Sequence, residues 1–199
     1  MQNTIICISR SYGSGGRAIG KLIAEHMNLP FYDRNLIYMA SEKNNIDLNL
    51  LAVNDESLNK NFSNFRIPDE KNKYISKENI FLCQSKIIKE ISDKNSCIII
   101  GRCAGHILRN TPHKVLRVFI WAPEHSCIDT VMKKFNINES EASKIIKQIN
   151  KHREDYYKHH TKSSRSDARN YDLCIDTSRM TYENAAKAIE EYSSIFSGL

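Results

Sequence analysis

Several features are missing from this 199-residue sequence. It has no run of 18 apolar residues, and no basic segment precedes an apolar stretch at its start. We therefore expect neither a membrane-spanning helix nor a signal peptide. The six cysteines are scattered without a Cys-x-x-Cys pair, and several of them lie in apolar, strand-like runs. This usage is typical of a reduced cytoplasmic protein and argues against a zinc site.

The remaining composition is that of an ordinary globular protein, with 41% apolar and 26% charged residues. The length fits one large domain or a core with insertions. The formal net charge of +6 suits anionic ligands, from nucleotides to nucleic acid, without choosing among them.

The most informative stretch is residues 3–20. Ile5–Ile8 is a short apolar run that predicts a buried strand of a parallel sheet. The chain then enters a glycine-rich segment, residues 11–16, and continues into a helical pattern, one side of which carries Ile19, Leu22, Ile23 and His26. This layout is typical of a phosphate-binding loop, because its N–H groups can turn inward and the helix N-terminus adds partial positive charge. Arg17 follows the last loop glycine, where a cation could reach the same phosphates.

The loop matches the standard phosphate-binding pattern only in part. When G-x-x-x-x-G-K-[ST] is laid over residues 11–18, only its second glycine is kept, as Gly16. Ser11 replaces the first glycine, Arg17 the lysine, and Ala18 the hydroxyl residue. The dinucleotide pattern G-x-G-x-x-G fails as well. A plain strand-to-helix turn is the alternative, but three glycines exceed what such a turn needs, so we favour a phosphate site.

Four further strands are predicted, and helices alternate with all of them. The strands are Phe31–Tyr32, Cys97–Ile100, Val115–Trp121 and Asp172–Ile175. This alternation predicts an α/β fold with a parallel sheet that helices cover on both faces.

Charged residues follow two of these strands. Asp33 and Arg34 come after the second strand, and Arg102 follows Gly101 at the end of the most apolar one. Open α/β sheets bind ligands at the carboxyl ends of their strands. A charge at the tip of a buried strand also needs an anionic partner. We therefore assign Arg102 to a ligand site, while Asp33 and Arg34 could equally be a helix cap and a surface arginine.

A basic run lies between Lys147 and Arg169, on a predicted helix from Glu139 to about His159 and the residues after it. From charge alone, a solvated helix face is the favoured interpretation. The pair His159–His160 is also interpreted as solvated, because neighbouring helical residues point about 100° apart. An RNA-binding stripe is a weaker alternative, since no recognised RNA motif accompanies the run.

Several of these stretches together resemble the cytidylate-kinase-like family, a branch of the P-loop nucleoside monophosphate kinases. They occur in order along the chain: Ser9–Gly20, Phe31–Arg34, Ile99–Arg102, Arg153–Lys158 and Asn170–Leu173. The resemblance implies a three-layer α/β/α fold of P-loop NTPase type, with a five-stranded parallel sheet. It also implies one domain, with its core in residues 1–41, 77–134 and 170–199, a helical monophosphate-binding insertion in 42–76 and an arginine-bearing lid in 135–169.

The resemblance further implies transfer of the γ-phosphoryl group of ATP, with Mg²⁺, to a nucleoside monophosphate, CMP or dCMP being the favoured acceptor. The donor phosphates would lie on Ser11, Tyr12, Gly13, Ser14, Gly15, Gly16, Arg17 and Ala18. The acceptor would face Asp33, Arg34 and Arg102. The lid would contribute Arg153, with Lys158, Arg165 and Arg169 as further candidates. The residues closest to the chemistry would be Arg17, Asp33, Arg102 and Arg153.

Three departures from well-studied cytidylate kinases concern the loop and the metal. Arg17 replaces the loop lysine, and neither Ala18 nor Ile19 offers the hydroxyl that usually contacts magnesium. Ile100 stands where those enzymes have an aspartate. Ser14 and Asp33 are left as candidate magnesium contacts. The alternatives are a nucleotide-binding protein that transfers no phosphate and a kinase for another small acceptor.

The site assignment predicts that two arginines serve different substrates. Arg17→Ala is expected to weaken triphosphate binding, and Arg102→Ala mainly acceptor binding, because each removes a cation from one anionic ligand. Binding titrations of both substrates on both variants would check this. If both affinities stayed unchanged in both variants, the assignment would be wrong.

Overall fold

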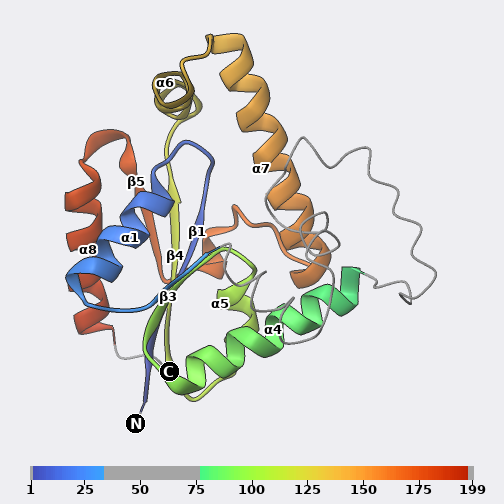
Figure 1. Ribbon diagram of the computed structural model, residues 1–199, viewed down its shortest axis with the longest axis vertical. Helices are drawn as coiled ribbons and strands as arrows, with labels where there is room; N and C mark the ends of the chain where they lie inside the picture. The colour runs from blue at the N-terminus through green and yellow to red at the C-terminus, as the bar shows by residue number, and fades with distance from the viewer. Residues whose placement is uncertain (1, 34–76, 197–199) are drawn as a thin grey trace.

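The computed structural model describes residues 2–33 and 77–196. Its centre is a five-stranded, entirely parallel sheet with the order β2-β3-β1-β4-β5 (Figure 1). The strands are β1 (Thr4–Arg10), β2 (Phe31–Tyr32), β3 (Cys97–Ile100), β4 (Lys114–Trp121) and β5 (Leu173–Asp176). The predicted five-stranded parallel sheet is confirmed.

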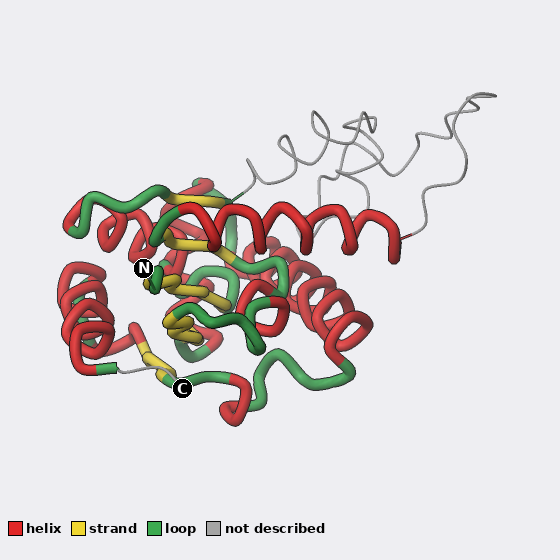
Figure 2. The backbone as a smooth tube through the Cα atoms, turned by 90° about the horizontal axis from the view of Figure 1, so that it is seen from below, coloured by secondary structure: helices red, strands yellow, loops and turns green. Residues whose placement is uncertain are grey.

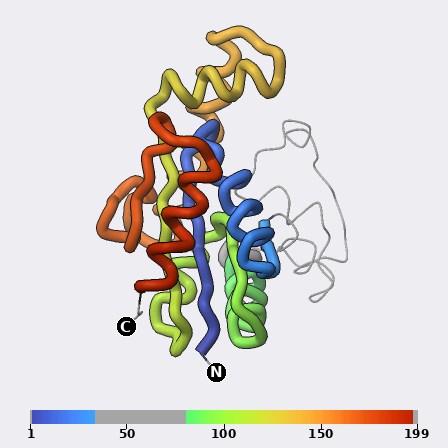
Figure 3. The backbone as a smooth tube through the Cα atoms, turned by 90° about the vertical axis from the view of Figure 1, so that its left-hand side faces the viewer, coloured from blue at the N-terminus to red at the C-terminus, as the bar shows by residue number. Residues whose placement is uncertain are grey.

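Helices cover both faces of the sheet. Figure 2, which looks along the strands, shows them between two helical layers. One layer contains α1 (Gly16–His26) and α8 (Tyr182–Ile195), which lie in front of the strands in Figure 3. The other contains α4 (Lys77–Lys94) and α5 (Ala104–Ile107). The remaining elements are α6 (Glu124–Phe135), α7 (Glu139–Thr161) and the 3₁₀ helices η2 (Ala168–Asn170) and η3 (Thr177–Arg179). This is the predicted three-layer α/β/α fold.

Alternating residues of the central strands divide the core into two halves. Ile6 and Ile8 of β1 pack with α1 and α8, whereas Ile5 and Cys7 pack with α4 and α5. All four are buried, as expected for a parallel strand with both faces covered. Burying an isoleucine side chain is worth about 1.5–3 kcal/mol, so these side chains stabilise the packing of both helical layers on the sheet.

A third apolar cluster joins α6 and α7. Its buried members are Cys127, Val131, Ala142 and Ile146, and Tyr12 of the glycine-rich loop packs against them. The helix pair is thereby attached to the loop through side-chain packing.

Several predicted details are corrected. β1 continues to Arg10, because Ser9 and Arg10 pair with Phe119 and Ile120 of β4. The last helix begins at Tyr182 and is capped by Thr181, whereas residues 176–178 lead into η3. The sequence pattern predicts that Ala185, Ala188 and Ile189 of this helix pack inward; Ala185 and Ile189 do, but Ala188 is exposed and Ala186 is buried instead.

The interpretation of the paired histidines as solvated is wrong for one of them. His159 is exposed, but His160 stacks on Phe81 of α4, with ring centroids 3.9 Å apart. The sequence could not show this, because the stacking partner lies 79 residues earlier in the chain. Among residues 2–33 and 77–196, no cluster of three or more acidic, histidine or cysteine side chains is placed to hold a metal ion.

The sequence pattern also predicts a helix from about residue 34 to 41. That helix and the insertion at 42–76 lie outside the described residues. The division of the chain into core, insertion and lid stays a prediction. Over the described ranges, no helix combines the length and the apolar character that crossing a membrane requires.

The start of α7 provides a test of the fold. The Asn138 side chain accepts a hydrogen bond of 2.9 Å from the Glu141 backbone N–H, which has no partner within the helix. Asn138→Ala should therefore lower the free energy of unfolding by about 1 kcal/mol, measured by urea denaturation. Asn138→Asp is the control, since it keeps the accepting oxygen. Equal midpoints for the alanine variant and the wild type would contradict the cap.

Candidate active site

A cavity of about 580 Å³ lies at the carboxyl ends of β1 and β3 and extends to α6. Such a volume is typical of small-molecule sites. The residues that line it are Arg10, Ser11, Tyr12, Gly13, Gly15, Gly16, Arg17, Ala18, Asp33, Arg102, Thr130, Val131, Lys134, Phe135, Arg153 and Tyr182. The structure thus brings together predicted candidates from four separate parts of the chain: the glycine-rich loop, Asp33, Arg102 and Arg153.

The glycine-rich loop has a backbone that other residues adopt only with strain. Gly13 and Gly15 have φ angles of 91° and 79°. A Cβ on Gly13 would lie 2.7 Å from the carbonyl oxygen of Cys127, and one on Gly15 would lie 2.2 Å from the Tyr182 ring. The first turn of α1 lines the cavity directly after the loop, so the helix N-terminus and its unpaired N–H groups open onto it.

Ser14 is the one predicted loop contact that does not line this cavity. It is buried, and its hydroxyl lies within hydrogen-bonding distance of the carbonyl oxygens of Ser11 and Ile120, at 2.9 and 3.1 Å. The hydroxyl therefore fastens the loop to β4, an arrangement that does not support Ser14 as a magnesium contact. The Thr177 hydroxyl reinforces the same junction by donating to the Ser14 carbonyl at 2.9 Å.

Arg17 and Asp33 form an ion pair across the cavity wall, with 2.5 Å between Nε and Oδ2. The Arg17 side chain is 57% exposed, whereas that of Asp33 is 8% exposed. Asp33 is the only carboxylate among the described lining residues. It is therefore the one described lining residue with a charged ligand for a hard cation such as Mg²⁺. The predicted acceptor contact Arg34 lies outside the described residues.

Arg102 stands at the end of β3 on an unusual backbone. Gly101, Arg102 and Cys103 all have left-handed φ angles, of 73°, 58° and 54°. Such residues cost about 1–3 kcal/mol each when they are not glycine, and they cluster at functional sites. The turn leaves Arg102 2% exposed and in contact with the cavity. A buried guanidinium at this position suits a bound anion.

The lid candidates separate into two groups. Arg153 and Arg165 are both buried, and both donate to the carbonyl oxygen of Arg10, at 3.2 and 2.7 Å. Arg153 lines the main cavity, and with Arg102 and Arg165 it also lines a small adjoining recess. Lys158 and Arg169, by contrast, are exposed and line neither space.

The buried arginines also lie over aromatic rings, which favour a cation above their faces. The Arg153 guanidinium is 5.6 Å from the Tyr12 ring centroid, and that of Arg165 is 5.6 Å from the Phe119 centroid. Arg169 instead pairs with Asp167 at 2.8 Å, and this hydrogen bond raises the pKa of Arg169.

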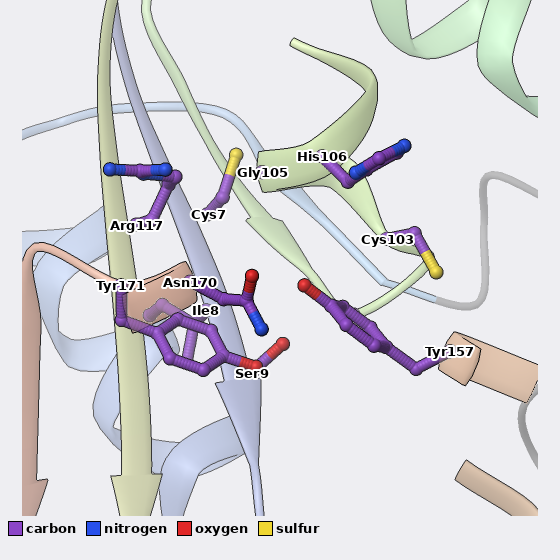
Figure 4. A pocket seen from close by; sticks show the side chains of 11 residues that line it. Cys7, Ile8, Ser9, Cys103, Gly105, His106, Arg117, Tyr157, Asn170 and Tyr171 are labelled. Atoms are coloured by element: carbon purple, nitrogen blue, oxygen red, sulfur yellow. The ribbon is translucent and has the colours of Figure 1, made fainter. Parts of the chain in front are cut away.

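Partly buried polar side chains lie near the segment that carries Arg165, and Figure 4 shows Arg117, Tyr157 and Tyr171 among those that line a small pocket there. Asp172 binds the guanidinium of Arg117 through both carboxylate oxygens, at 3.0 and 2.5 Å, and this raises the pKa of Arg117. The Tyr171 hydroxyl donates to the Arg165 carbonyl at 2.7 Å. Burial raises the pKa values of Tyr171 and Tyr157, so both phenols stay protonated even well above neutral pH.

The sequence did not single out several lining residues. Arg10 was missed because the first strand was predicted to end at Ile8. Thr130, Lys134 and Phe135 come from α6, and Tyr182 from α8. Arg10 could have been found, because it is a charged residue close to the carboxyl end of a predicted strand, where such folds bind ligands. No local pattern marks the others, since only the fold brings them to the loop.

The parallel sheet, with a glycine-rich loop and a helix after its first strand, is the fold of P-loop kinases of nucleotides and other small molecules. The chain belongs to the cytidylate kinase-like family, whose sequence model matches residues 5–179. The suspected family is thereby confirmed. No curated protein matches the chain.

Solved structures agree on the fold. An uncharacterised protein from Eubacterium ventriosum is 26% identical, with 96% of this chain and 99% of that chain covered and a TM-score of 0.73. A shikimate kinase from Bacteroides thetaiotaomicron is 15% identical, with 96% and 98% covered and a TM-score of 0.54. The YorR protein of Bacillus subtilis, solved in complex with phosphorylated GDP, is 12% identical, with 96% of each chain covered and a TM-score of 0.52.

The loop geometry predicts an effect of a single methyl group. Gly13→Ala should weaken ATP binding at least about tenfold, or about 1.4 kcal/mol, because the backbone has a positive φ and the new Cβ meets main-chain atoms of Cys127. Calorimetric titration would measure this. Gly105→Ala is the control, since that glycine lies in α5 outside the cavity, and the nearest atom to its new Cβ would be a side-chain carbon of Arg117 at 3.0 Å. Wild-type affinity in Gly13→Ala would contradict the assigned loop.

Proposed function

We propose that this protein transfers the γ-phosphoryl group of ATP to a nucleoside monophosphate, with CMP or dCMP as the favoured acceptor. One observation carries the proposal. A single cavity joins the glycine-rich loop to Arg102 from β3 and Arg153 from α7. These are the groups that a donor triphosphate, an acceptor phosphate and the phosphoryl group between them require.

The three groups divide the work by position. The donor phosphates bind to the N-terminus of α1 and to the loop residues that line the cavity, from Gly13 to Ala18 without Ser14. Arg102 holds the acceptor phosphate at the end of β3. Arg153, supported by Arg165, lies over the phosphoryl group in transfer, where positive charge stabilises the equatorial oxygens.

The reaction itself needs alignment rather than a nucleophilic side chain. An oxygen of the acceptor phosphate forms a bond to the γ-phosphorus as the bond to the β,γ-bridging oxygen breaks, giving ADP and a nucleoside diphosphate. The buried setting of Arg102 and Arg153, 2% and 8% exposed, strengthens their interaction with the developing charge. It also limits the access of water, which would otherwise hydrolyse ATP.

Magnesium fits this site through Asp33. Mg²⁺ in such sites is usually held by one or two carboxylates together with substrate phosphates, and Asp33 lies in the cavity wall. The ion would neutralise charge on the β- and γ-phosphate oxygens. Arg17 would then exchange Asp33 for the donor phosphates.

A second candidate is nucleotide binding without phosphoryl transfer. It is favoured by the ion pair that engages both Arg17 and Asp33, together with the absence of a hydroxyl at Ala18. A kinase for another small acceptor is a third possibility, because the fold neighbours include a shikimate kinase.

A coupled assay of ADP release distinguishes these candidates. The protein is given ATP, Mg²⁺ and each of a panel of nucleoside monophosphates, with shikimate as a further acceptor. Turnover with CMP or dCMP well above the background hydrolysis of ATP is the expected result.

Arg153→Ala tests the arginine that lies over the phosphoryl group. Arg169→Ala is its matched control, since Arg169 lies outside the cavity. ATP binding without turnover on any acceptor would favour the non-catalytic candidate.

A further inference from the structure

Two cations that line the cavity, Arg10 and Lys134, have no role in the function proposed above, and Lys134 is the one that the structure places against the glycine-rich loop from another helix. Lys134, in the last turn of α6, is the only lysine among the described residues that line the cavity. It is exposed, and its ammonium lies 5.4 Å from the centroid of the Phe135 ring. Its side chain is therefore accessible to a ligand in the cavity.

The helix that carries Lys134 touches the glycine-rich loop. The two meet at Gly13 and Cys127: a Cβ on Gly13 would lie only 2.7 Å from the carbonyl oxygen of Cys127. Val131 and Lys134 follow Cys127 at intervals of four and three residues, so all three share one face of α6. Both Val131 and Lys134 line the cavity. The face that meets the loop thus continues to Lys134.

The loop itself has no lysine, and its arginine is engaged. Arg17 occupies the lysine position of the phosphate-binding pattern and pairs with Asp33. A lysine differs from an arginine, because its ammonium is a compact charge with three donors on a flexible stem. Among the described lining residues, only Lys134 on α6 offers an ammonium to a triphosphate that lies along the loop.

We propose that Lys134 supplies, from α6, the ammonium that binds the donor phosphates in place of the loop lysine. This inference rests on the proposed function, since it requires a triphosphate donor in the cavity. It adds a cation to Arg17 on the donor side and leaves Arg102 to the acceptor.

The next residue in the sequence offers a matched control. Lys133 is also exposed but does not line the cavity. Lys133→Ala and Lys134→Ala remove the same charge one position apart. Calorimetry on the full chain at one fixed salt concentration would measure the affinities for ATP and for inorganic tripolyphosphate. Lys134→Ala is expected to weaken both at least about tenfold, and Lys133→Ala less than about twofold.

The outcomes separate this inference from the function on which it rests. If the wild type binds ATP and the two alanine variants bind it equally well, Lys134 is not a donor-phosphate ligand. Loss of ATP affinity without loss of tripolyphosphate affinity would overturn the phosphate assignment as well. A wild type that binds neither compound would refute both the donor site and the proposed function. Lys134→Arg, which keeps the charge, is expected to retain more affinity than Lys134→Ala.

Discussion

The carbonyl oxygen of Arg10 is the point on which the arrangement of the site depends. It accepts hydrogen bonds from Arg153 of α7 and from Arg165 of the segment that follows. Hydrogen bonds that involve a charged group are worth about 1.5–3 kcal/mol each. Because Arg10 is the last residue of β1 and lies directly before the glycine-rich loop, these bonds hold both arginines beside that loop.

This concentration of positive charge has a structural cost. Arg102, Arg153 and Arg165 are each at least nine-tenths buried, and burying a guanidinium is unfavourable unless polar or aromatic groups surround it. The Tyr12 and Phe119 rings and the Arg10 carbonyl supply part of that surrounding. Among the described lining residues only Asp33 is acidic, so the cavity favours a polyanion over a cation or a neutral ligand. The left-handed backbone at residues 101–103 adds to this cost, because it is the conformation that carries the buried Arg102.

Local sequence patterns were enough to predict the sheet, its parallel direction and its helical layers, because each central strand is a short apolar run and both faces are buried. They could not separate Arg153 from Lys158. Both belong to one basic run on one helix, and only packing against Tyr12, 141 residues earlier, makes Arg153 a buried group. The same limit explains His160, whose partner is Phe81. Site residues at the ends of strands were more predictable than those on α6 and α7, since the carboxyl ends of parallel strands all lie at one edge of the sheet.

The ion pair between Arg17 and Asp33 explains how one loop can tolerate an arginine in place of a lysine. The Arg17 side chain is more than half exposed, so its contribution to stability is at the weak end for ion pairs, about 0–1 kcal/mol. Such a pair separates readily when a stronger anion arrives. Asp33, however, is buried, so a cation that approaches it as the guanidinium leaves would stabilise its carboxylate. The donor phosphates and a cation at Asp33 would therefore favour each other's binding, because each engages one member of the pair. In the absence of both, the pair keeps the only carboxylate among the described lining residues neutralised and leaves the glycine-rich backbone open to the cavity.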